Sequence, residues 1–142
     1  MSRFGGFDHV DCRVRSLAAV ESFYDVLMPE LGLPLKRYAH VDLAGEWHDV
    51  THERPYNAVE YYESPHGDEA AFFIGFIERH DHLPGDTRIA FRVEGARLAD
   101  LEAHLERIGA ERIERNDDME KYPAIFFEDP AGTKLEIVAR RT

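Results

Sequence analysis

Residues able to bind metals or transfer protons alternate with apolar residues in a predicted strand over residues 4–14. One side of this strand carries His9, Asp11 and Arg13, and the other carries Val10, Cys12 and Val14. An imidazole beside a carboxylate suits metal binding or proton transfer, and a guanidinium suits an anion. We therefore expect the apolar side to pack on a helix and the polar side to line solvent or a site.

The same pattern restarts after residue 86. In residues 88–93, Arg88 and Arg92 share one side of a predicted strand with Ala90. Near the end of the chain, Glu136 alternates with Leu135 and Ile137 and so also belongs to a polar face. We expect the function to lie where the two polar faces meet.

Each half of the chain reads as strand, helix and then three strands. In the first half, Ser16 caps a helix that Gly32 ends, and strands cover residues 35–41, 59–62 and 70–77. In the second half, Gly109 ends the helix, and strands cover residues 111–115, 124–128 and 134–139. Residues 80–86 are expected to link the halves. This predicts an α+β fold in a single domain, with modules at 1–79 and 86–142.

Composition excludes several classes of protein. The 142 residues carry 28 acidic and 17 basic side chains, a net charge of -11, which argues against nucleic-acid and anionic-membrane partners. The one cysteine, Cys12, allows no intrachain disulfide and no cysteine-based zinc site, and it is expected in the core. With no apolar leader and no run of membrane-spanning length, a cytoplasmic location is expected.

Three segments together resemble a known superfamily. FDHVDCRVRSLAAVESFYDVLMPELGL is similar to the opening of the vicinal oxygen chelate proteins, which include glyoxalase I, bleomycin-resistance proteins and extradiol dioxygenases. RIAFRV resembles the start of their second module, and FFEDPAGTKLEIV resembles their closing hairpin. The resemblance covers most of the chain and is weakest over residues 42–62. It implies two βαβββ modules forming a cupped mixed sheet around a cleft, and a homodimer.

The resemblance also implies a divalent metal held by three positions. Here those positions are His9, Arg88 and Glu136. The family usually has histidine at the middle position, and arginine offers a metal no lone pair.

Three hypotheses follow for this set of residues. A metal (Zn, Fe, Mn or Ni) could be kept by His9 and Glu136 with a substitute such as Asp11 or a histidine from residues 40–52. Alternatively, the site has no metal, and Arg88 supplies the fixed positive charge and pairs with Glu136. In the third hypothesis, the three residues only satisfy each other in the core.

The resemblance implies a role for each residue if the protein is an enzyme, expected to be a lyase or dioxygenase of the glyoxalase type. Glu136 would act as base or ligand, His9 as ligand or proton shuttle, and Arg88 as electrostatic stabiliser. The alternative is a protein that binds or sequesters a small molecule without catalysis, as bleomycin-resistance proteins do. A domain that only assembles with itself or a partner is a third hypothesis.

Further residues are expected to contact the ligand. Arg13 and Arg92 add cations to the polar faces, so the cleft is expected to prefer a small oxygen-rich or anionic molecule, and Asp11 lies among them. Residues 42–58 are expected to form a loop over the cleft that brings Trp47 and His48 to the ligand. The sequence HDVTH at 48–52 resembles the HExxH motif of zinc proteases but has aspartate in place of the glutamate and lacks a helical pattern. We therefore reject a zinc-protease function for this segment.

Overall fold

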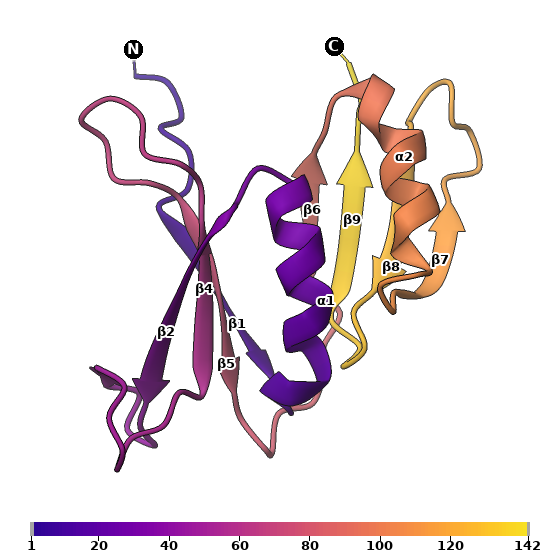
Figure 1. Cartoon of the computed structure of the whole chain (residues 1–142). Helices are drawn as coiled ribbons and strands as arrows, with labels where there is room; N and C mark the ends of the chain where they lie inside the picture. Colours follow the sequence, from indigo (N-terminus) through magenta and orange to yellow (C-terminus); the bar gives the residue numbers. More distant parts are fainter. Residues whose placement is uncertain (1, 142) are drawn as a thin grey trace.

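The first half of the chain forms a five-stranded sheet in the computed structural model, which describes residues 2–141. Its order is β1-β5-β4-β2-β3, with β1 parallel to β5 and the other neighbours antiparallel. The strands are β1 (His9–Val14), β2 (Leu35–Val41), β3 (Trp47–His48), β4 (Ala58–Tyr62) and β5 (Phe73–Glu78). Helix α1 (Leu17–Glu30) makes the crossover after β1 (Figure 1).

The second half repeats this plan with four strands in the order β6-β9-β8-β7. The elements are β6 (Arg88–Arg92), α2 (Gly95–Leu105), β7 (Glu111–Arg115), β8 (Ala124–Glu128) and β9 (Lys134–Val138). Again the first and last strands of the module pair in parallel. The predicted α+β fold of two βαβββ modules is confirmed.

Two strand boundaries differ from the prediction. The first strand begins at His9 rather than at residue 4, because Gly5 and Gly6 precede it and Gly6 has a φ of +89°. Strand β5 begins at Phe73 rather than at residue 70, where its pairing with His9 of β1 starts. The segment 42–58 contains a strand, β3, that pairs with β2. It therefore extends the sheet, where a loop was predicted.

Helix α1 begins and ends at the residues that the sequence indicated. The Ser16 hydroxyl accepts a hydrogen bond from the Ala19 N–H at 3.3 Å, and the Leu17 N–H donates to Glu78 at the end of β5. Gly32 follows the last turn with a φ of +94°. These caps fix where α1 starts relative to the first sheet. Neither helix described in residues 2–141 is long and apolar enough to cross a bilayer.

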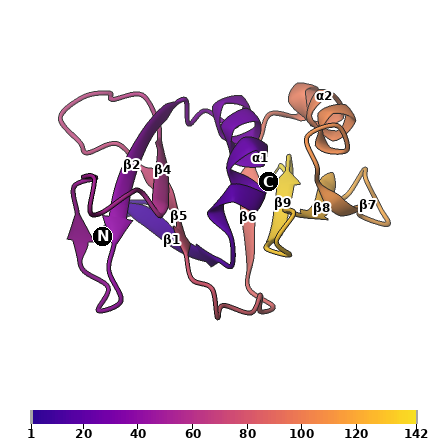
Figure 2. The same cartoon turned by 60° about the horizontal axis from the view of Figure 1, so that its bottom comes forward.

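Helix α1 lies between the two sheets, as Figures 1 and 2 show from two directions. Tyr24 of α1 stacks on Phe76 of β5 with ring centroids 3.7 Å apart, and Phe23 contacts Phe127 of β8. One continuous hydrophobic core contains residues of α1, α2 and both sheets. The apolar sides of both sheets thus face the helices, and their other sides point away from this core.

A buried hydrogen bond joins the two modules through this core. The Tyr24 hydroxyl donates to Asp129 at 2.6 Å, and both residues are fully buried. Asp129 opens the turn between β8 and β9, where its other carboxylate oxygen accepts the N–H groups of Ala131 and Thr133. The carboxylate therefore stabilises the turn and anchors α1 at the same time.

Removing the Tyr24 hydroxyl should destabilise the protein. We expect Tyr24→Phe to lower the free energy of unfolding by about 1.5–3 kcal/mol, because a bond to a charged, buried acceptor is lost. Urea unfolding measures this. The matched control is Tyr56→Phe, whose exposed hydroxyl donates to Glu21 at 2.9 Å and should cost at most about 0.5 kcal/mol. Equal losses in the two variants would contradict the proposed anchor.

Cys12 should resist alkylation in the folded protein. Burial, together with the nearby carboxylate of Asp129, raises the pKa of the Cys12 thiol to about 12. At pH 8 only about one thiol in 10⁴ would be a thiolate, against a substantial fraction in the unfolded chain. Iodoacetamide labelling followed by mass spectrometry should show slow modification in buffer and rapid modification in urea. Similar rates in both conditions would show that the thiol is accessible.

Candidate functional site

The outward side of the first sheet, which we call face one, carries most of the candidate residues of the first half. Its side chains form three rows across β1, β5, β4 and β2: His9–Phe73–Tyr62–Leu35, Asp11–Gly75–Glu60–Arg37 and Arg13–Ile77–Ala58–Ala39. The first row is aromatic except for Leu35, the second is charged around a glycine, and the third is apolar except for Arg13.

His9 belongs to a stack of flat groups that crosses the sheet. Its ring is parallel to that of Phe73, with centroids 4.6 Å apart, and Phe73 stacks on Tyr62 at the same distance. The guanidinium of Arg37 lies 4.7 Å from the centre of the Tyr62 ring. This stack holds the His9 ring upright on the exposed side of the sheet.

The two nitrogens of His9 have different surroundings. Nδ1 lies 2.7 Å from a carboxylate oxygen of Asp8, and this hydrogen bond is the main reason that the pKa of His9 is raised. Nε2 lies 3.8 Å from Asp11, too far for a hydrogen bond. With Nδ1–H donating to Asp8, Nε2 is left as a free acceptor on face one.

Asp11 and Glu60 flank Gly75 in the second row. A Cβ atom at position 75 would lie 3.0 Å from Oδ1 of Asp11. The absence of a side chain on Gly75 therefore leaves room for this carboxylate. Burial raises the pKa of Glu60, and the negative charge of Asp11 adds to the effect. The sequence analysis did not single out Glu60, although alternation along β4 could have placed it on the polar side.

The outward side of the second sheet, face two, centres on Glu136. This carboxylate is 5% exposed and accepts a hydrogen bond from the Tyr122 hydroxyl at 2.9 Å. That hydrogen bond raises the pKa of Tyr122. Tyr122 was missed because it lies in the loop before β8, where no periodicity indicates which way a side chain points.

Arg88 and Arg92 lie on the exposed edge strand of face two. The guanidinium of Arg88 is 4.8 Å from the centre of the Phe126 ring, and Phe126 is the cross-strand neighbour of Glu136. Within residues 2–141, Arg88 has no ion-pair partner, so the pair with Glu136 that one hypothesis required does not form. Lys134, the strand partner of Arg88, binds Asp86 at 2.8 Å.

The structure therefore does not bring His9 to Arg88 and Glu136 within one chain. The strand pairing puts His9 on the outward side of the first sheet and Arg88 and Glu136 on that of the second. Helix α1 lies between the two sheets (Figure 1). The donors fit a metal poorly at this position, because one chain offers a single carboxylate beside a guanidinium.

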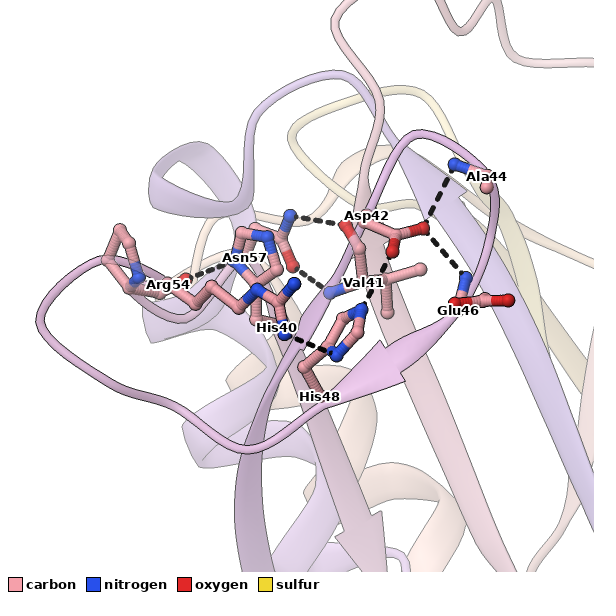
Figure 3. Close-up of polar contacts among 9 residues, drawn as sticks. His40, Val41, Asp42, Ala44, Glu46, His48, Arg54 and Asn57 are labelled. Carbon is pink, nitrogen blue, oxygen red and sulfur yellow. Dashed lines mark hydrogen bonds and ion pairs between the residues drawn. The ribbon is translucent and has the colours of Figure 1, made fainter.

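The hairpin β2–β3 holds the remaining candidates. Trp47 pairs with Val41 and extends face one at its far edge, with 42% of its surface exposed. His48 instead joins a local cluster, drawn in Figure 3: its Nε2 lies 2.7 Å from Asp42, and its Nδ1 lies 2.6 Å from the Arg54 guanidinium. The hydrogen bond from His48 is the main reason that the pKa of Asp42 is lowered.

Asp42, Glu46 and His48 form a candidate metal-binding cluster. Their ligand atoms lie within 4.8 Å of one another. However, the second oxygen of Asp42 already accepts the N–H groups of Ala44 and Glu46, and Arg54 occupies the other nitrogen of His48 (Figure 3). These contacts explain the cluster without a metal, as a hydrogen-bond network that stabilises the hairpin turn.

Solved structures of other proteins share this architecture. Neither a protein-family model nor a curated protein matches the sequence. Among solved structures, a glyoxalase/bleomycin resistance protein from Albidiferax ferrireducens has a TM-score of 0.61 and 19% identity, over 95% of this chain and 98% of that one.

Fosfomycin resistance proteins have the same architecture. A mutant of FosX from Listeria monocytogenes, in complex with Mn(II) and 1S,2S-dihydroxypropylphosphonic acid, has a TM-score of 0.59 and 16% identity, over 98% of this chain and 95% of that one. FosX from Mesorhizobium loti also has a TM-score of 0.59, at 16% identity over 98% of this chain and 94% of that one. The chain therefore has the fold of the vicinal oxygen chelate superfamily, the fold shared by glyoxalase, bleomycin-resistance and fosfomycin-resistance proteins.

Proposed function

We propose that this protein binds a small oxygen-rich or anionic molecule on face two, with Arg88 as a fixed cation at the position where the sequence resemblance implies a metal ligand. The observation that carries the proposal is the arrangement of Arg88 over Phe126, beside the nearly buried Glu136 that Tyr122 orients. A guanidinium presents donors in a fixed plane to paired oxygens of a ligand. Glu136 and Tyr122 supply a carboxylate and a phenol for ligand hydroxyl groups.

A second copy of the chain would complete this site. Face one and face two lie on different sheets of one chain, and each carries charged side chains on its outward side. Face one has the carboxylates of Asp11 and Glu60 near His9, while the edge of face two has Arg88 and Arg92. In a homodimer that pairs face one with face two, these opposite charges attract, and His9 approaches Glu136 of the second copy.

Catalysis of the glyoxalase type is the second candidate function, and the Glu136–Tyr122 hydrogen bond favours it. A carboxylate held in one orientation and shielded from water can remove a proton next to a carbonyl group. Arg88 would then stabilise the negative charge that develops on the substrate oxygen. Glu136 would then return the proton to the neighbouring carbon, directly or by way of His9 of the second copy, and would be a carboxylate again.

Binding should persist without metal and depend on Arg88. With 1S,2S-dihydroxypropylphosphonic acid as the probe and a chelator present, isothermal titration calorimetry should show saturable binding. We expect Arg88→Met to raise the dissociation constant at least about tenfold, because the fixed cation is lost. Arg107→Met, which removes an exposed cation just after α2, is the matched control and should change little.

A metal requirement would give the opposite pattern. Binding that appears only with added Mn²⁺ and disappears in His9→Ala would contradict the metal-free site. Loss of a stoichiometric metal in His48→Ala, with His9→Ala unaffected, would assign the metal to the Asp42–Glu46–His48 cluster. Elemental analysis of each purified variant separates these results.

The homodimer is tested by sedimentation equilibrium. We expect a dimer at concentrations of about 10 µM, and we expect Arg88→Glu to weaken it because a negative charge would then face Asp11 and Glu60. Arg107→Glu makes the same charge change away from both faces and should leave the dimer intact. A wild-type monomer at about 100 µM would refute the shared site.

A further inference from the structure

A cavity of about 310 Å³ lies at the end of face one, beyond its third row. Arg13 of β1 borders it, and Val41, Leu43 and Ile77 give it an apolar lining. Its volume is at the small end of the range for ligand pockets, which is about 300–1,000 Å³. The cavity is therefore large enough for a compact organic molecule.

The acidic residues around this cavity already have partners. Asp42 binds His48 and two backbone N–H groups, and Glu78 accepts the Leu17 N–H at 2.9 Å. The remaining acid, Asp81, lies 3.7 Å from the guanidinium of Arg79. These contacts balance the negative charges at the rim.

Arg13 is a cation at the rim of the cavity that takes part in none of these contacts. Among residues 2–141, the hydrogen bonds and ion pairs include none made by its side chain, although the residue is partly buried. Its cross-strand neighbour on β5 is Ile77, which is 1% exposed, and the same row continues to the fully buried Ala58 on β4. A guanidinium beside such an apolar surface attracts an anion more strongly than one surrounded by water.

We propose that this cavity binds the anionic head of an amphipathic small molecule, with a carboxylate or phosphonate on Arg13 and a short apolar group against Val41, Leu43 and Ile77. A planar guanidinium can donate two parallel hydrogen bonds to either kind of head group. The proposal rests on the proposed function, because face one is half of the shared site, and it adds a second anchoring point for the ligand. The cavity proposal also requires the ligand to have an apolar part, whereas binding to the cations of face two does not.

Two anions and one neutral analogue test the cavity. The probes are phenylphosphonate, benzoate and benzyl alcohol, titrated into the full-length protein by calorimetry with a chelator present. We expect at least one anion to bind and to weaken with added salt, and benzyl alcohol to bind at least about tenfold more weakly. Comparing phenylphosphonate with benzoate identifies the preferred head group.

Matched variants locate the binding. Arg13→Met should weaken the anion at least about tenfold, because it keeps the length of the side chain and removes the charge. Arg79→Met removes a cation from the same rim that is already paired with Asp81, and it should change the affinity by less than about threefold. Circular dichroism and the thermal midpoint confirm that both variants are folded.

The outcomes separate this proposal from the function proposed for face two. Loss of binding in Arg88→Met with full binding in Arg13→Met would overturn the cavity and leave face two supported. Loss in Arg13→Met alone supports the cavity, and loss in both variants supports a ligand that spans the two cations. Anion binding that both variants retain, or no anion binding by the wild type up to about 10 mM, would overturn it.

Discussion

The buried hydrogen bond between Tyr24 and Asp129 ties the two modules together, and the rest of the arrangement depends on it. Asp129 has no exposed surface, so its charge must be balanced by the donors around it, which are the Tyr24 hydroxyl and two turn N–H groups. Meeting that demand fixes α1 against the β8–β9 turn. The helix is thereby held between the sheets, and each sheet turns its apolar side inward.

This packing decides where chemistry can occur. Because both apolar sides are used against the helices, His9 and Glu136 lie on the outward sides of two different sheets. Arg88 lies over Phe126 instead of pairing with Glu136, so its charge remains available on the surface. In the proposed homodimer, His9 and Glu136 come from different copies, whereas the Arg13 cavity lies within one chain.

Local signals in the sequence predicted the fold well. Alternation along β1, β6 and β9 gave the face of the candidate residues on those three strands, and Ser16 and Gly32 marked the ends of α1. The two modules were visible because each needs its own amphipathic helix and alternating strands. The short strand β3 was missed, since two residues give no periodicity and only pairing with β2 makes them a strand.

The sequence by itself determined the two βαβββ modules and the side of the strand on which His9, Arg88 and Glu136 lie, because periodicity is a local property of the backbone. Only the tertiary structure decided what each of these side chains meets. Tyr122 reaches Glu136 from a loop, and Glu60 approaches Asp11 because Gly75 has no side chain between them. Such contacts depend on strand order and sheet packing, which join residues far apart in the sequence.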